Sequence, residues 1–301
     1  MYKFLHRLKV SHYISKHFLS VNFLPFKFIY WLLSKVSFTR TIQNKKSNYK
    51  VFVSGGIGWM NLISNYEPWF EKILDSIVLN EETVFVDIGA NIGQTMLKVL
   101  SRNSSVRYIG FEPNKKCMVY LEKLAGLNSY QNISLYNFAL SDRKGETSLH
   151  LRFDDDLLAT TTPSFRKYTN YAKKQTVLEI TGDELLEKEA IDTVSVIKID
   201  VEGGETKVLL GLKRTITEYH PIIICEVLPL YSKSEEVSTF RKSSAIKILE
   251  IVCDLDYQIY NIKNKTEITS VNDFSSSLES ANYILLPAGE LNDFRLQLGL
   301  E

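Results

Sequence analysis

Acidic residues recur in this sequence at the ends of predicted buried strands. The carboxylates in question belong to Asp87, Glu112, Asp142, Asp200, Glu202 and Glu226. In an open α/β sheet the carboxyl ends of parallel strands meet at one edge, where ligands bind, so we expect these side chains to gather there. Acids at such an edge can cap helices, accept hydrogen bonds from ligand hydroxyl groups or take up a proton.

The first of these acids lies inside residues 84–95, VFVDIGANIGQT, which predict a buried strand, a glycine turn and a helix start. Gly89 and Gly93 allow the chain to turn sharply and to approach a ligand closely. Glu112 follows the turn by about 20 residues, the spacing of an acid that accepts both hydroxyl groups of a ribose. The pattern therefore predicts a nucleoside ligand.

Two side chains in the turn argue against a dinucleotide. Asn91 stands where the dinucleotide fingerprint has its middle glycine, and Asp87 lies just upstream, where its charge would repel a pyrophosphate. The same residues suit a nucleoside with a cationic centre or an amino group, such as S-adenosylmethionine. An NAD-dependent oxidoreductase is the alternative enzyme, and this spacing disfavours it.

A second cluster of acids lies in residues 198–205, KIDVEGGE. Asp200 and Glu202 flank one residue at a strand end, so in extended geometry their side chains share a face. They can orient a substrate hydroxyl group, take its proton or bind a divalent cation, or they can simply favour a helix N-terminus. Glu226 and His220 are the other candidate bases, but His220 precedes its strand and is interpreted as structural. We assign no metal ligands.

The remaining apolar runs alternate between helix and strand patterns. We expect helices over 67–78, 96–100, 118–127, 208–212 and 245–255, and strands over 49–53, 106–111, 132–140, 146–153, 177–180, 194–200 and 221–227, with an antiparallel pair at 257–262 and 282–286. Strands that alternate with helices predict one α/β domain with a mostly parallel sheet. The polar stretch 154–174 is expected to be a loop.

Charge divides the chain unequally. Residues 1–66 contain ten Lys or Arg residues and no Asp or Glu, although the whole chain has a formal net charge of only +1. We expect this basic, aromatic leader to be a helical cap or a membrane-surface segment, joined to a globular domain of residues 67–301. Its most apolar run, 23–33, falls short of the roughly 20 residues that a bilayer span needs.

The leader also bears on partners and location. Its aliphatic and aromatic content disfavours a nucleic-acid arm, and residues 1–45 suit peripheral contact with the inner face of a membrane. Cys117, Cys225 and Cys253 show no metal or disulfide spacing, which predicts buried free thiols and a cytoplasmic protein. A non-catalytic nucleoside-binding module held at a membrane assembly is the alternative outside the enzymes.

Five strings together resemble the FkbM family of S-adenosylmethionine-dependent methyltransferases. They are VFVDIGANIGQT, GFEPN at 110–114, ALSDRKGE at 139–146, VIKIDVEGGE at 196–205 and HPIIICEV at 220–227. The resemblance implies a Rossmann-like class I methyltransferase: a mostly parallel seven-stranded sheet with helices on both faces and an antiparallel last strand. It also implies S-adenosyl-L-methionine as cofactor and a small-molecule or glycan acceptor.

The resemblance further implies roles for single residues. Asp87, Gly89, Asn91 and Gly93 would hold the methionine part of the cofactor, Glu112 the ribose, and residues 139–142, with Leu140 and Asp142, the adenine. Asn114 is also expected to bind the cofactor. Asp200 would face both cofactor and acceptor, and Asp200, Glu202 and Glu226 are the expected catalytic residues. The expected reaction is O-methylation of a sugar hydroxyl, with Phe165, Tyr168 and Tyr171 of the polar loop able to stack on the sugar.

Overall fold

The computed structural model describes residues 37–43, 48–54, 57–58, 62, 67–154, 156–166, 171–232, 234–289 and 292–300. The chain divides into two compact units, Met1–Pro68 and Trp69–Glu301. In the first, strands β1 (Phe38–Gln43) and β2 (Asn48–Val53) pair antiparallel. A strand at β2 was predicted and β1 was not, while the amphipathic and apolar segments predicted within residues 1–36 lie outside the described residues.

No helix in the described part of the chain is both long enough and apolar enough to cross a bilayer.

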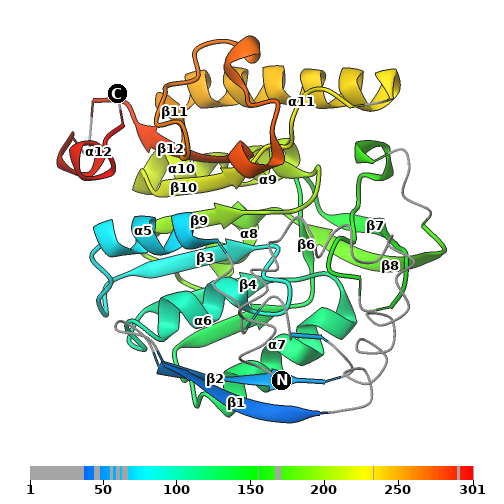
Figure 1. The fold of residues 1–301 in the computed structure, drawn as a ribbon, viewed down its shortest axis with the longest axis vertical. Coiled ribbons are helices and arrows are strands. Elements are labelled where there is room, and N and C mark those ends of the chain that lie inside the picture. Colours follow the sequence, from blue (N-terminus) through cyan, green and yellow to red (C-terminus); the bar gives the residue numbers. More distant parts are fainter. Residues whose placement is uncertain are drawn as a thin grey trace, which may run out of the picture. The chain divides into compact units, whose positions relative to one another are not determined.

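The second unit contains the predicted seven-stranded sheet (Figure 1). Its strands are β3 (Val84–Ile88), β4 (Arg107–Phe111), β5 (Ile133–Tyr136), β9 (Val196–Ile199), β10 (Ile222–Glu226), β11 (Tyr257–Asn261) and β12 (Asn282–Pro287). Their order is β11-β12-β10-β9-β3-β4-β5, and only β12 runs antiparallel to its neighbours. The expected Rossmann-like fold is confirmed, including its antiparallel last strand.

The strand order also locates a ligand crevice. From β3 the chain builds outward through β4 to β5, and then returns to the other side of β3 to place β9 and β10. In open α/β sheets such a reversal leaves a crevice beyond the carboxyl ends of the two strands that flank it, here β3 and β9.

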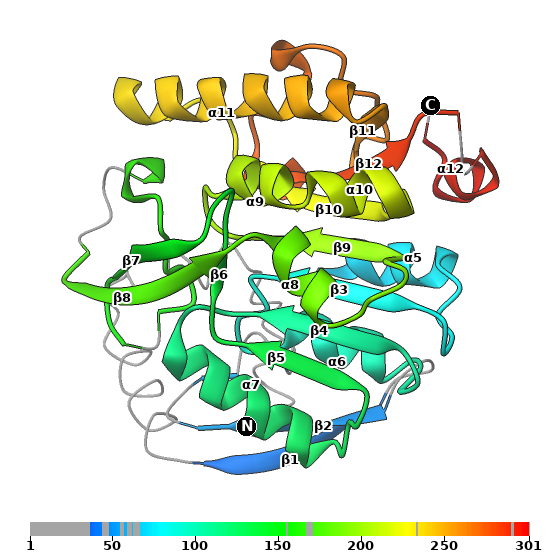
Figure 2. The same ribbon diagram turned by 180° about the vertical axis from the view of Figure 1, so that it is seen from behind.

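Helices cover both faces of this sheet, as Figures 1 and 2 show. They are α5 (Pro68–Ser76), α6 (Gln94–Leu100), α7 (Lys115–Leu127), α8 (Gly182–Lys188), α9 (Glu205–Gly211), α10 (Lys213–Tyr219) and α11 (Glu235–Asp254), with α12 (Asn292–Leu298) at the end. Alternation along β3 explains the two layers, because successive side chains point to opposite faces. Phe85 packs edge-on against Phe70 of α5, whereas Val86 joins a core cluster that contains Val208 of α9.

The stretch predicted as one strand over 132–140 is split between two sheets. β5 ends at Tyr136, and β6 (Ala139–Leu140) pairs instead with β8 (Lys173–Ile180), which also pairs with β7 (Gly145–Leu151). The break occurs at Asn137, whose side-chain amide donates to the carbonyl oxygens of Glu112 at 2.8 Å and Pro113 at 3.0 Å. These bonds turn the chain away from the large sheet.

Other differences concern element ends. α11 begins at Glu235, well before the predicted start at 245, because its first turn carries two acids, Glu235 and Glu236, that favour a helix N-terminus. β8 begins inside the predicted polar loop, and α8 was not predicted, although Thr181 accepts a capping hydrogen bond from the Glu184 amide. Cys117 and Cys225 are buried free thiols as expected, but Cys253 is exposed on α11.

Candidate functional site

The glycine turn after β3 is held against the end of β9. Gly89 has φ +87°, and a Cβ atom there would lie 1.9 Å from the backbone oxygen of Asp200. Gly93 has φ +93°, and Asn91 adopts the left-handed region at φ +52°. Only glycine, or Asn at some cost, adopts these conformations readily, so the local sequence sets the shape of the turn.

Asp87 lies beneath this turn and is fully buried. The Tyr108 hydroxyl of β4 donates a hydrogen bond to its carboxylate, and the Tyr108 ring stacks on Phe85. Burial and the Asp87 charge together raise the pKa of Tyr108 well above its ordinary value, so the phenol stays a donor. Sequence analysis missed Tyr108, because the contact joins neighbouring strands that are distant in sequence.

The Glu112 carboxylate, 7% exposed, lies at the end of β4 and faces the turn. It accepts hydrogen bonds from the backbone amides of Asn91 at 2.9 Å and Asn114 at 2.7 Å. Burial raises the pKa of Glu112 to about 7, although the two amide bonds act in the opposite direction. Near neutral pH the Glu112 side chain is therefore present in both its protonated and its ionised form.

The side chains of Asn91 and Asn114 reach toward a third segment. Asn91 Nδ2 donates to the Leu157 carbonyl oxygen at 2.9 Å, and its buried Oδ1 has no hydrogen-bond partner in the structure. Asn114 Oδ1 caps α7 by accepting from the Lys116 amide, and its Nδ2 donates to the Asp156 carbonyl oxygen. The Asn91 oxygen is thus an acceptor that a ligand amine or hydroxyl group can satisfy.

Three predicted acids form a compact cluster beside the turn. Carboxylate oxygens of Asp200, Glu202 and Glu226 all lie within 4.8 Å of one another. The extended geometry expected for the first two is not what brings them together. Glu202 is left-handed at φ +55° and Gly203 follows at φ +105°, so the chain folds back immediately after β9.

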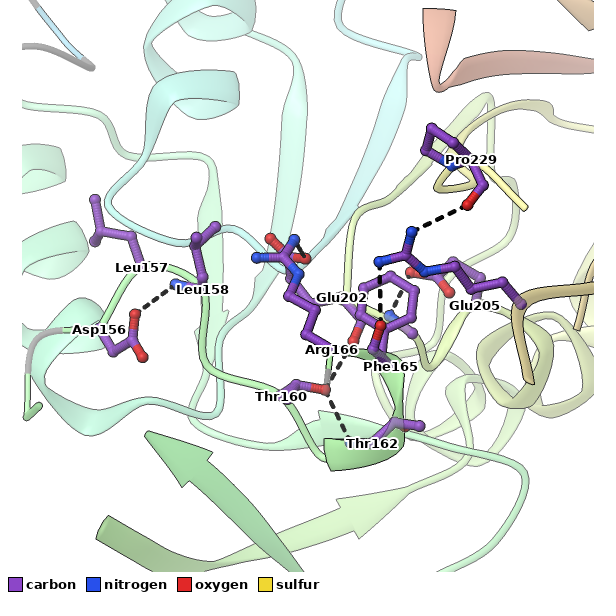
Figure 3. Close-up of polar contacts among 12 residues, drawn as sticks. Asp156, Leu157, Leu158, Thr160, Thr162, Phe165, Arg166, Glu202, Glu205 and Pro229 are labelled. Carbon is purple, nitrogen blue, oxygen red and sulfur yellow. Dashed lines mark hydrogen bonds and ion pairs between the residues drawn. The ribbon is translucent and has the colours of Figure 1, made fainter. Parts of the chain in front are cut away.

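Two cations, the buried Lys198 and the half-buried Arg166, neutralise part of this cluster. Lys198 of β9 places Nζ 3.1 Å from Asp200 Oδ2, and Arg166 pairs with the Glu202 carboxylate (Figure 3). Sequence analysis missed both residues. Lys198 was detectable, because it stands two positions before Asp200 in the strand, whereas no local pattern marks Arg166.

The cluster has two further features. Carboxylate oxygens at this spacing are the ligands that Mg²⁺ and Ca²⁺ use, while Lys198 and Arg166 already supply positive charge there. Glu205, the first residue of α9, is buried and accepts from the Gly203 amide at 2.9 Å. Burial, with the charges of Glu202 and Asp200 as smaller causes, raises the pKa of Glu205 to about 7.

The remaining predicted residues lie elsewhere. Leu140 is buried in the main core cluster, Asp142 is exposed, and His220 ends α10 at the opposite end of β10 from Glu226. In the polar loop, Phe165 is buried among Leu228, Ala281 and Phe240, and Tyr171 packs edge-on against His150. These two rings are packing residues in this structure. Tyr168 lies outside the described residues.

Comparison with known proteins identifies relatives for most of the second unit. A family model described as the methyltransferase FkbM domain matches residues 87–259. Hexuronic acid methyltransferase AglP of Haloferax volcanii is 29% identical over 144 residues, which cover 48% of this chain and 56% of AglP. 2-O-methyltransferase NoeI of Sinorhizobium fredii is 23% identical over 158 residues, 48% of this chain and 63% of NoeI.

The chain therefore matches less than two thirds of the length of either curated relative. Among solved structures, the methyltransferase FkbM of Methylobacillus flagellatus is similar, with 14% sequence identity and a TM-score of 0.44. The match covers 70% of this chain and 44% of that one.

Proposed function

Because the chain belongs to the FkbM family of methyltransferases, we propose that it transfers a methyl group from S-adenosyl-L-methionine to a hydroxyl group of a sugar in a glycan or glycoconjugate. The observation that carries the proposal is the position of Asp200. Its backbone carbonyl lies against Gly89 of the glycine turn after β3, residues 89–93, which we call the nucleoside turn. Its carboxylate belongs to the cluster of Asp200, Glu202 and Glu226, which we call the acid cluster. A cofactor site and an acceptor site therefore meet at one residue.

The residues of the turn fit this cofactor. Asn91 offers a buried acceptor oxygen that lacks a donor, Glu112 can accept from ribose hydroxyl groups, and buried Asp87 disfavours a pyrophosphate. When bound, S-adenosylmethionine supplies a methyl group on a positively charged sulfur, already activated for displacement. The protein has to align the acceptor and exclude water.

Asp200 is our candidate for the general base. Its side chain is 33% exposed, against 11% for Glu202, so an acceptor reaches it more readily. The nearby Lys198 ammonium donates a hydrogen bond to Asp200 Oδ2 at 3.1 Å and so orients the Asp200 carboxylate. A carboxylate in hydrogen-bond reach of an acceptor hydroxyl group can take its proton as the oxygen attacks.

The acceptor class is supported by the chemistry of the cluster and by the relatives. The carboxylates of Asp200, Glu202 and Glu226 can accept hydrogen bonds from the hydroxyl groups of a sugar. Of the two curated relatives, one is named as a hexuronic acid methyltransferase and the other as a 2-O-methyltransferase. Membership of a methyltransferase family also removes the dehydrogenase alternative.

The proposal is tested in two stages with the full chain. Isothermal titration should show S-adenosylmethionine binding and no binding of NAD. Transfer of a tritiated methyl group should then be measured with neutral oligosaccharides and with their uronic-acid counterparts. We expect label in a base-stable O-methyl ether of a sugar. Label that is released by mild base would identify a methyl ester and contradict the hydroxyl acceptor, and tight NAD binding would contradict the cofactor.

Glu112 predicts how cofactor binding depends on pH. Its pKa of about 7 means that the carboxylate needed by the ribose is mostly protonated at pH 6. We therefore expect affinity for S-adenosylmethionine to be roughly tenfold lower at pH 6 than at pH 8. Glu112→Gln should weaken binding and flatten this dependence in calorimetric titrations from pH 6 to 8.5. An unchanged slope in the variant would assign the titration to another group.

The raised pKa of Glu112 also makes the stability of the ligand-free protein depend on pH. The folded state holds the Glu112 proton up to about pH 7, whereas the unfolded chain releases it near the ordinary glutamate pKa of 4.5. This contribution to stability is therefore fully present below pH 4.5 and is lost as the pH rises to about 7.

For the leader we propose peripheral membrane contact through residues 1–45. Its ten Lys or Arg residues within 1–66, unopposed by any acid, would attract an anionic membrane surface. Deletion of residues 1–45 should move the protein from the membrane fraction to the supernatant of a cell lysate. If the truncated and full chains partition alike, the leader has another role.

A further inference from the structure

Residues 156–166, which we call the strap, cross the carboxyl edge of the large sheet. Within the described chain they contact the loops that follow four adjacent strands, β4, β3, β9 and β10. Figure 3 shows the strap passing from Asp156 to Arg166 beside Glu202. It therefore spans both the nucleoside turn and the acid cluster.

One end of the strap is fixed at the nucleoside turn. Its first two carbonyl groups, those of Asp156 and Leu157, accept from the side-chain amides of Asn114 at 3.2 Å and Asn91 at 2.9 Å. The Asp156 side chain is buried, accepts from the Leu158 amide at 3.0 Å and forms an ion pair with Arg152. This end is held by charge as well as by hydrogen bonds.

The other end is fixed at the acid cluster. Thr160, 2% exposed, donates through its hydroxyl group to the Glu202 backbone oxygen at 2.7 Å, and Arg166 pairs with the Glu202 carboxylate. The Phe165 ring lies so close to Gly203 that a Cβ atom there would be 2.6 Å away. Phe165 also packs with Leu228 after β10.

The backbone of Glu202 shows why these contacts matter. A non-glycine residue in the left-handed region is strained and persists only where its surroundings hold it. Glu202 has φ +55°, and the strap binds both its backbone oxygen and its carboxylate. The strap therefore opposes relaxation of this residue and fixes where its carboxylate points.

We propose that the strap is a positioning element, held at the nucleoside turn by Asn91 and Asn114, that keeps Arg166 and Thr160 on Glu202. On this basis Asn114 acts through the strap, since both ends of its side-chain amide are already used by the α7 cap and by Asp156. The proposal rests on the proposed function only for the meaning of the acid cluster. The strap would mechanically link loops that follow different strands of the sheet.

The test uses hydrogen exchange of the full chain without ligand, read by mass spectrometry. Asn114→Ser keeps a good N-cap residue but removes the donor to Asp156. Loss of one such hydrogen bond should speed exchange about fivefold. We expect the effect to reach residues 160–166 at the far end of the strap, and Arg166→Met to speed exchange at residues 156–158. Arg166→Lys should partly restore protection, because it keeps a cation for Glu202.

Exchange in a double variant distinguishes one strap unit from two independent ends. If the strap opens as one unit, the two losses act on the same opening step, so Asn114→Ser combined with Arg166→Met should speed exchange at both ends by about the product of the two single effects. Lys173→Ala, which removes an exposed ion pair with Asp154 just outside the strap, should leave strap exchange unchanged. Unchanged exchange in β3 and β9 shows that each variant is folded.

Effects confined to residues beside each substitution, so that the double variant matches the nearer single variant at each end, would overturn the proposal. Titration of the same proteins with S-adenosylhomocysteine separates it from the proposed function. If the wild-type chain binds no S-adenosylhomocysteine, the methyltransferase assignment fails while the exchange result still stands. If the chain binds it and exchange at the two strap ends is not coupled, the strap proposal alone fails.

Discussion

Gly89→Ala is expected to abolish cofactor binding and to lower the free energy of unfolding by about 3 kcal/mol, the combined cost of a left-handed alanine and an overpacked contact. The new Cβ atom would lie 1.9 Å from the backbone oxygen of Asp200. That oxygen cannot move aside easily, because the Asp200 amide is bonded to the Ile88 carbonyl at 2.9 Å. The turn and the end of β9 must therefore separate, which takes the nucleoside turn away from the acid cluster.

Urea unfolding and calorimetric titration with S-adenosylmethionine measure the two effects. Gly126→Ala is the matched control, since nothing lies within 4 Å of the position that a Cβ atom would take on α7. Replacing a helical glycine by alanine should leave binding intact and be neutral or stabilising by up to about 1 kcal/mol. Wild-type stability and affinity in Gly89→Ala would show that the turn does not press on β9 as described.

Asp200→Asn is expected to reduce methyl transfer at least about a hundredfold while cofactor affinity changes only a few fold. The amide keeps the shape of the side chain but cannot take a proton, and loss of a general base costs roughly 10²- to 10⁴-fold in rate. The ion pair between Lys198 and Asp200 would be lost, so some loss of stability is also expected. Turnover at saturating cofactor, with a sugar acceptor found by the tritium assay, is the measurement.

Two variants separate the base from its surroundings. Lys198→Met keeps the carboxylate but removes the cation that orients it, so its loss of turnover should be smaller than that of Asp200→Asn. Asp154→Asn changes an exposed carboxylate and should behave like the wild type. Full turnover in Asp200→Asn would remove Asp200 from proton transfer and direct the search to Glu226, the cluster member on the neighbouring strand.

The sequence by itself determined the architecture of the large sheet. Buried apolar runs, each followed by a helix pattern, predicted the parallel strands, and an apolar pair at the end predicted β11 and β12. It also determined the turn after β3, because the glycines at 89 and 93 permit positive φ values there. Both signals are local, because the burial pattern and the backbone conformation depend on the type of each residue and of its close neighbours in the sequence.

Only the tertiary structure decided how the site is held. Periodicity could not show that residues 132–140 serve two sheets, since a strand pattern does not name its partner. Nor could it show that Arg166 reaches Glu202 or that Asn114 holds Asp156, because these residues are distant in sequence. The acids of the site could be predicted from the sequence, because they follow predicted strands. Their orientation and charge compensation depend on packing and hydrogen bonds that the folded chain alone brings into contact.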